Sequence, residues 1–420
     1  MTINNSGGQY LMDNNFKPSL LPYRWIILVV VWLGAFIGSY AQFQLPPLAY
    51  KLMPELNLTP SQYASILTAP MLPAVFFSIV AGTLADRFGV KRVVTVGFIF
   101  ATVGIFFRYV ATNYWQMLIL MALAGTSSAF LNANIAKILG AWFPPEQLSK
   151  AMGIYITSPT FAMSVGMATT AMFSSIKAAF ITAGIGCILT AVIWVALAKD
   201  KPEGAPELPA MPVAQYLGVA ARSKNVWLVG LALLFMMGGA MAFSGFLPDA
   251  LHSVRGIDPV TAGFLASMGT IGTLLGSILG PIICDRIGYM RRFLFSAGAL
   301  GAVTIFYSWQ APLGAWIWMM LILSGVLAGA AGPILMSFPM LLPEIGPVYA
   351  GSAGGLMATL QLIGAVAIPT FIIAPLAGHN YYMMFGLAGM SIFLLGIVSL
   401  FLPELGRKAI VKPSGPSQSL

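Results

Sequence analysis

"GTLADRFGVKRVV", residues 82–94, concentrates one Asp, two Arg and one Lys between two long apolar stretches. Only 8% of the 420 residues are charged, so this short segment holds a large share of the charge of the chain. A charged side chain is costly inside hydrocarbon. The segment is therefore predicted to lie where the chain leaves a membrane, or where a moving part of the protein needs charge.

The composition is that of a polytopic membrane protein. Hydrophobic residues make up 58% of the chain and the mean hydropathy is +0.87, far from the usage of soluble domains. The net charge is +9, but Lys and Arg fall in short segments between apolar runs, which indicates membrane topology rather than a nucleic-acid partner. The two cysteines, Cys187 and Cys284, predict neither a disulfide framework nor a metal site, and no cofactor is expected.

Twelve apolar segments are long enough to cross a bilayer, for which a helix needs roughly 20 residues. They are 24–48, 61–85, 91–111, 114–141, 149–172, 178–198, 224–249, 260–284, 292–309, 314–340, 350–375 and 381–402. A Pro-rich, charged stretch separates the sixth from the seventh. We therefore expect a tail (1–23), a six-helix bundle (24–198), a linker (199–223), a second six-helix bundle (224–402) and a second tail (403–420).

The distribution of positive charge predicts the orientation. With the N-terminus in the cytoplasm, the tails and even-numbered connections hold most of the 21 Lys and Arg residues, while the odd-numbered connections hold Lys51, Lys177 and Arg255. This asymmetry is what the positive-inside rule requires. We expect a multi-pass protein of the cell membrane, a bacterial inner membrane, with both termini and the linker on the cytoplasmic side.

The opening stretch has a second copy, "PIICDRIGYMRRFL" (281–294). Both copies read D-R-x-G followed by two basic residues, and each lies between the second and third predicted helix of its half. Two six-helix halves in the same orientation are the plan of transporters whose substrate site lies between the halves near the bilayer midplane. The matching residues are Asp86, Arg87, Gly89, Lys91 and Arg92, and Asp285, Arg286, Gly288, Arg291 and Arg292.

"GTLADRFGVKRVV" resembles the cytoplasmic signature of the major facilitator superfamily, G-x-L-a-D-r-x-G-r-k-x-x-l. The twelve helices and the fainter second copy extend the resemblance over nearly the whole chain. It implies an all-α fold of two six-helix bundles and transport by alternating access. It also implies a latch in which Asp86 contacts Arg87 or Arg92 and the start of the eleventh helix near Gly351. On this interpretation the gating residues are Asp86, Arg87, Gly89, Arg92, Asp285, Arg286 and Gly288; the alternative is that the basic residues only set topology.

A further resemblance covers residues 107–155, from "FRYVATNYWQ" to "SKAMGIY". This stretch is similar to the anion and cyanate/nitroimidazole-type branches of the superfamily. The Arg that the family often has in the fourth helix is replaced by Met121, which weakens the case for a drug/proton antiporter. None of the twelve carboxylates falls in the middle of a predicted helix. Any transported proton would therefore travel on the substrate or on Lys137. Asp249 and His252 form either an external proton-sensing pair or a solvated loop pair.

The charges expected within or near helices are positive. Lys137, with Asn134 and Asn132 close by, is either an anion ligand or gate, or a side chain that snorkels to the interface. Arg108 either attracts anions or anchors to headgroups. Other polar groups in helices that line the cavity in this family bind substrate or only join helices; they are Tyr40, Gln42, Gln44, Tyr155, Ser158, Thr359 and Gln361.

These residues favour a secondary active transporter that moves a small organic anion, a monocarboxylate or similar. Two alternatives remain open: an exporter of neutral or weakly hydrophobic small molecules, and a receptor or scaffold that does not transport. An enzyme is not expected, since no His/Cys/carboxylate constellation lies at membrane depth. The expected partners are a small-molecule substrate and the lipid bilayer, with a co-transported proton left open. No nucleic acid is expected, and the protein is expected to be a monomer.

Overall fold

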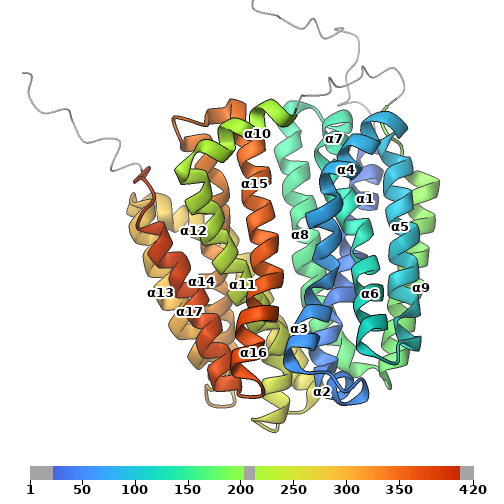
Figure 1. Ribbon diagram of the computed structural model, residues 1–420, viewed down its shortest axis with the longest axis vertical. Helices are drawn as coiled ribbons and strands as arrows, with labels where there is room; N and C mark the ends of the chain where they lie inside the picture. Colours follow the sequence, from blue (N-terminus) through green and yellow to red (C-terminus); the bar gives the residue numbers. More distant parts are fainter. Residues whose placement is uncertain (1–21, 203–212, 407–420) are drawn as a thin grey trace, which may run out of the picture.

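The computed structural model describes residues 22–202 and 213–406, and the regular elements in these ranges are helices (Figure 1). The first half contains α1 (Tyr23–Phe43), α2 (Leu45–Glu55), α3 (Pro60–Thr68), η2 (Ala69–Met71), α4 (Leu72–Phe88), α5 (Val90–Phe106), η3 (Phe107–Val110), α6 (Tyr114–Ala124), α7 (Thr126–Trp142), α8 (Pro145–Thr169), η4 (Thr170–Met172) and α9 (Ile176–Leu197). The second half contains α11 (Lys224–Ser253), α12 (Pro259–Ile287), α13 (Met290–Ser308), α14 (Ala315–Leu341), α15 (Gly346–Ala367), η5 (Ile368–Ile373), α16 (Ala374–Ala377) and α17 (Tyr381–Ser399).

Nine helices of the described ranges are long and apolar enough to span a membrane, and the bent pair Pro60–Ser78 and Val80–Phe88 makes a tenth. The more polar α8 and α13 run beside them (Figure 1), and their assignment as the remaining two of the twelve expected crossings stays a prediction. A further helix, α10 (Val213–Arg222), lies inside the stretch predicted as a linker. The division of the chain at 24, 198, 224 and 402 stays a prediction.

Proline and glycine explain where several crossings break. Pro46 and Pro47 open α2 directly after α1 ends, because proline lacks the N–H that would continue the hydrogen bonding of the preceding helix. Pro70 lies in the turn η2 between α3 and α4. A Cβ at Gly125, between α6 and α7, would lie 1.8 Å from the Pro70 carbonyl oxygen, so only glycine fits there. The two breaks therefore pack against each other.

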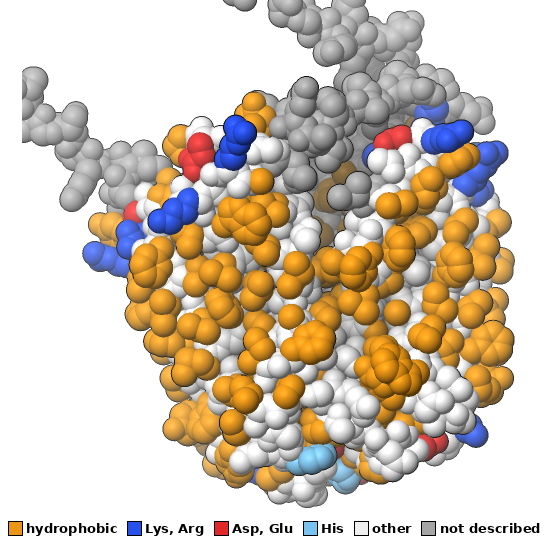
Figure 2. Space-filling view, viewed as in Figure 1, with side chains coloured by type: hydrophobic (Ala, Val, Ile, Leu, Met, Phe, Trp, Pro, Cys, Tyr) orange, Lys and Arg blue, Asp and Glu red, His pale blue; other side chains and the backbone are white. Residues whose placement is uncertain are grey.

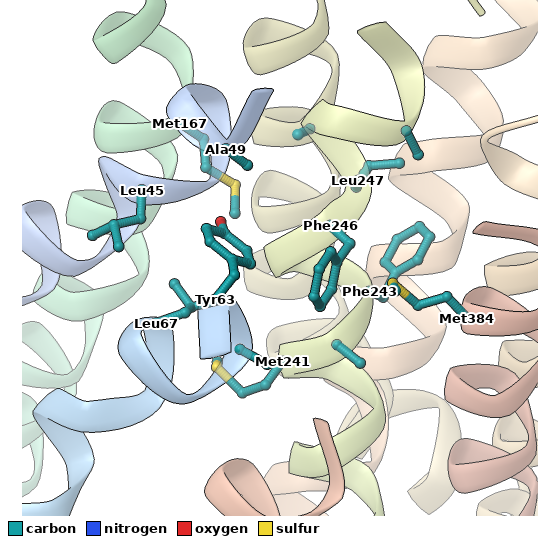
Figure 3. Packing of buried hydrophobic residues seen from close by; sticks show 14 of the residues in the cluster. Leu45, Ala49, Tyr63, Leu67, Met167, Met241, Phe243, Phe246, Leu247 and Met384 are labelled. Atoms are coloured by element: carbon teal, nitrogen blue, oxygen red, sulfur yellow. The ribbon is translucent and has the colours of Figure 1, made fainter. Parts of the chain in front are cut away.

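The two ends of the bundle differ in how its halves meet. We call the end that carries the two D-R-x-G turns, at Gly89 and Gly288, the motif end, and the other the opposite end. One large cluster of buried hydrophobic residues takes members from both halves, including Tyr63, Phe246 and Met384 (Figure 3). Two other clusters each belong to a single half, one within residues 27–198 and the other within 220–402. The halves therefore share a core toward the opposite end only.

Aromatic contacts across the halves close the opposite end. The Tyr63 hydroxyl on α3 donates to the Gly245 carbonyl on α11 at 3.1 Å, and its ring packs edge-on against Phe246, 5.2 Å between centroids. The rings of Tyr50 on α2 and His252 on α11 are 4.6 Å apart. At the motif end the halves part, as the space-filling view shows (Figure 2). The structure is thus closed at the opposite end and open at the motif end.

Candidate functional site

An ion pair joins α4 to α7 near the motif end. The Lys137 ammonium lies 2.5 Å from the Asp86 carboxylate and also donates to the Gly82 carbonyl oxygen at 2.9 Å. The lysine and aspartate side chains are 37% and 45% exposed. An ion pair this exposed contributes about 0.2–1 kcal/mol after screening by solvent. The pair is therefore weak enough to exchange partners.

Sequence reasoning did not anticipate this partner for Asp86. The expected partners were Arg87 or Arg92 and the region near Gly351. Instead, the Arg87 guanidinium lies over the ring of Phe88, 5.2 Å from its centroid, and Arg92 is exposed. Lys137, predicted either as an anion ligand or gate or as a snorkelling side chain, thus has two partners on α4, Asp86 and Gly82.

The two asparagines near Lys137 lie in different surroundings. Asn132 is exposed and accepts a hydrogen bond at 2.5 Å from the hydroxyl of Tyr155, so α7 is tied to α8 beside an open surface. Asn134 is buried and donates to the Phe130 and Ala81 carbonyl oxygens. Its own side-chain oxygen is buried without a hydrogen-bond partner. Asn132 keeps an accessible side chain, whereas Tyr155 is 4% exposed and Asn134 lies in the α4–α7 contact.

In each half, a carboxylate that follows the last membrane crossing accepts hydrogen bonds from backbone N–H groups just after the D-R-x-G turn. Asp200 accepts from the backbone N–H of Lys91 at 2.5 Å. Glu404 accepts from the N–H groups of Met290 and Arg291 at 2.7 and 3.2 Å. Each carboxylate thus meets the partly positive N-terminus of the third helix of its half. Sequence reasoning missed both residues.

The glycines of the two turns fit this arrangement. Gly89 and Gly288 have φ angles of 86° and 78°, a region that other residues adopt at a cost. A Cβ at Gly89 would also lie 2.8 Å from an Asp200 carboxylate oxygen. Asp285 and Arg286, which precede Gly288, are exposed. The turns of the two halves therefore share one design, although Asp86 alone of the two motif aspartates has an ion-pair partner among the described residues.

Another carboxylate of the motif end, Glu344, lies between α14 and α15. Burial raises the pKa of this carboxyl, but hydrogen bonds from Asn225, its own backbone and Ser223 outweigh that effect and bring the pKa below its ordinary value. The Asn225 amide is 2.8 Å from the carboxylate. Glu344 therefore remains ionised at neutral pH and joins the start of α11 to the turn before α15.

Arg108 is buried between helices of the first half and contacts neither solvent nor the lipid headgroup level. It is 1% exposed and donates to the carbonyl oxygens of Ala41 and Ile105 and to the side-chain oxygen of Gln44. Its guanidinium stacks 4.4 Å from the centroid of Phe180. The expectation of a headgroup anchor is wrong, because Arg108 instead fixes the point where α1 ends and α2 begins.

The remaining polar candidates make contacts between or within helices. Those that bridge helices are Gln42, which donates to Leu67, Gln44, which donates to Ala179, and Ser158, which donates to Trp32. The Tyr40 ring stacks on Phe36. Thr359 is exposed and donates to the Gly355 carbonyl oxygen of its own helix, and Gln361 is partly buried. Of these, Thr359 keeps the most accessible side chain.

Asp249 and His252 do not form the expected pair. α11 continues to Ser253, so Asp249 is 5% exposed inside a candidate membrane span. It accepts hydrogen bonds from the hydroxyls of Tyr381 and Ser253. His252 is hydrogen-bonded through Nδ1 to Ile257. Asp249 lies in the last turns of α11 and not in the middle of that helix, but the expectation of a solvated loop pair is wrong, because Asp249 is buried next to the closed opposite end.

A cavity of about 310 Å³ lies between α1 and α8. Its lining is apolar and aromatic, made by Trp25, Leu28, Val29, Trp32 and Ile154. The indole N–H groups of the two tryptophans are the side-chain hydrogen-bond donors that this lining offers to a small anion. The polar candidates for substrate contact are therefore found on α7 and α8 rather than in this cavity.

Three features define a membrane transporter of two halves: the fold, the paired D-R-x-G turns, and a core that the halves share only toward the opposite end. The chain belongs to the Major Facilitator Superfamily, whose family model matches residues 31–369. This is a family of transporters and not of enzymes. The chain is 23% identical to a probable nitrate/nitrite transporter of Mycobacterium tuberculosis, over 71% of this chain and 74% of the relative. It is 24% identical to a probable sulfoacetate transporter of Cupriavidus necator, over 91% and 94%.

Among solved structures, the chain is similar to a bacterial homolog of the human lysosomal transporter Spinster in an inward-facing, unoccupied conformation. The TM-score is 0.72 at 16% sequence identity, over 90% of this chain and 95% of that chain. At this identity the likeness concerns the fold.

Proposed function

We propose that this transporter moves a small organic anion, a monocarboxylate or an anion of similar size, by alternating access. The observation that carries the proposal is the position of Lys137, a partly exposed lysine on α7 near the open motif end, five residues after the exposed Asn132 on the same helix. An ammonium supplies charge-assisted hydrogen bonds to a carboxylate or sulfonate. In this proposal Lys137 binds the anion, and Asn132, which the Tyr155 hydroxyl holds in place, and Thr359 contribute hydrogen bonds.

Two observations support an anionic substrate: the substrates for which two relatives are named, and the position of the acidic residues. The two relatives above are named for nitrate, nitrite and sulfoacetate, all of which are anions. Asp249, the buried acid of α11, accepts hydrogen bonds from Tyr381 and Ser253 at the closed opposite end. A cationic or neutral substrate would meet Lys137 near the opening with no acid beside it other than Asp86.

We further propose that the motif end faces the cytoplasm, because the basic residues of the chain gather there. On this assignment the protein lies in the bacterial inner membrane with both termini inside, and the structure is inward-open. The predicted division into two bundles of six crossings around a linker at 199–223 belongs to the same proposal. A proton carried with the anion, on the substrate or on Lys137, is compatible with it.

Flux into proteoliposomes tests the substrate class. We expect uptake of at least one of sulfoacetate, nitrate and lactate above that of protein-free liposomes, and no uptake of glucose. Uptake of glucose without any of the anions would favour the exporter of neutral compounds. Absence of flux for all four would favour the receptor or scaffold.

A further inference from the structure

We propose that Lys137 is shared between Asp86 and the transported anion, so that binding of the anion frees Asp86 and allows the motif end to close. The inference rests on the proposed anion transport and adds the step that couples substrate binding to the gate. It starts from the ion pair itself, because Asp86 belongs to the gating motif while Lys137 is the proposed ligand, and the two are in direct contact.

The pair occupies the position where such an exchange is physically accessible. Both side chains are partly exposed, and among the described residues the ammonium has one further partner, the Gly82 carbonyl oxygen. A lysine side chain is long and can turn its ammonium between two acceptors without movement of the helix. An anion that enters from the open end therefore competes with the Asp86 carboxylate for the same positive charge.

Glycines at the motif end indicate where the halves meet after closure. Elsewhere in the membrane helices, glycines are packed closely: a Cβ at Gly104 would lie 2.4 Å from the backbone of Ala124, and one at Gly272 would lie 2.2 Å from that of Ile322. Close to the motif end the opposite holds, since several helical glycines have open space within 4 Å of an added Cβ. They are Gly82, Gly140 and Gly153 in the first half and Gly351, Gly354 and Gly355 in the second.

Glycine is unfavourable inside a helix, and in membranes it serves for close approach of helices. These uncovered surfaces on α4, α7 and α8 and on α15 therefore fit a conformation in which the halves come together at the motif end. Asp86 lies one turn from Gly82 on α4, so it approaches the start of α15 as that end closes. A carboxylate freed from Lys137 meets the partly positive N-terminus of α15 there.

The exchange predicts opposite effects for the two members of the pair. Asp86→Asn removes the carboxylate that competes with the anion for the Lys137 ammonium. The affinity for the anion should therefore rise about two- to fivefold, which is the gain expected when a weak, exposed ion pair no longer has to be broken. The same variant loses closure. Lys137→Gln frees Asp86 permanently, so the motif end closes without any anion. A purely structural ion pair predicts neither the tighter binding nor the anion-independent closure.

Spin labels on Phe88→Cys and Ser352→Cys, on α4 and α15, report closure in a background without Cys187 and Cys284. In the otherwise unchanged protein we expect the distance between the labels to shorten when sulfoacetate or nitrate is added. With Asp86→Asn it should stay long although the anion binds more tightly, and with Lys137→Gln it should be short from the start. Lys137→Arg, which keeps the charge, should restore the long distance and is the control for correct folding.

Two results would overturn the exchange. One is unchanged or weaker binding of the anion by Asp86→Asn; the other is a long distance in folded Lys137→Gln. If none of sulfoacetate, nitrate and lactate binds to the unchanged protein, the proposed function fails, and the distance in Lys137→Gln without anion still decides whether Lys137 restrains Asp86.

Discussion

The hydroxyl of Tyr63, on α3, donates a hydrogen bond to the backbone carbonyl of Gly245, on α11, and so joins the two halves of the transporter at the end where they are closed. The ring of the same residue packs on Phe246 (Figure 3). The contact must break when this end opens. Tyr63 therefore stabilises one conformation of the transport cycle over the other.

Tyr63→Phe should raise the population of molecules open at the opposite end by about two- to tenfold, since a hydrogen bond of this kind contributes about 0.5–1.5 kcal/mol. The alkylation rate of Ala49→Cys, whose position on α2 is buried in the closed contact, measures the change. Tyr382→Phe, at a half-exposed tyrosine on α17, is the matched control. An equal rate in all three proteins would show that the bond does not hold this end closed.

The carboxylates that hold the D-R-x-G turns should matter for stability. Asp200→Ala and Glu404→Ala should each lower the free energy of unfolding by roughly 0.5–2 kcal/mol, the cost of losing a carboxylate at a helix N-terminus. Gly89→Ala should destabilise further, because of its φ angle and the nearby Asp200. Thermal unfolding in detergent checks this, with the exposed Glu55→Ala as control; a loss no larger than that of the control would mean that the caps are dispensable.

Arg108 should be required for folding rather than for recognition of the substrate. Arg108→Lys loses the forked donors that reach Ala41 and Gln44, and each hydrogen bond to a charged group contributes about 1.5–3 kcal/mol. We expect a lowered unfolding temperature and a poor yield, compared with Arg92→Gln at an exposed site. A stable Arg108→Lys protein with weakened anion binding would instead identify Arg108 as a ligand.

The orientation predicts which positions face the cytoplasm. Phe88 and Ile287 precede the glycines of the two turns and are 47% and 41% exposed. Single cysteines at these positions, without Cys187 and Cys284, should react with an impermeant thiol reagent only in inverted vesicles. Leu313→Cys, at the opposite end, should react only in right-side-out cells. The reverse pattern would place the motif end outside.

The sequence predicts the crossings, the repeat and the family, because hydropathy and the D-R-x-G turns are local signals. The ion pair of Asp86 with Lys137 was not predictable in this way, since it depends on how α4 packs against α7. Asp249 was expected in a solvated pair at the helix end, but α11 continues to Ser253 and packing buries this carboxylate, which hydropathy alone does not predict. Alignment of the two halves would have found Asp200 and Glu404, since each acid follows the sixth crossing of its half.

The central claim is tested most directly by equilibrium binding. Sulfoacetate and nitrate are titrated into the purified unchanged protein and into variants of Lys137. A charge-assisted hydrogen bond contributes about 1.5–3 kcal/mol, so Lys137→Ala should raise the Kd about 10- to 100-fold, and Lys137→Arg should keep part of the affinity. Lys177→Ala, at an exposed lysine away from α7, should bind as the unchanged protein does. Unchanged binding and transport by a correctly inserted Lys137→Ala protein would contradict the account.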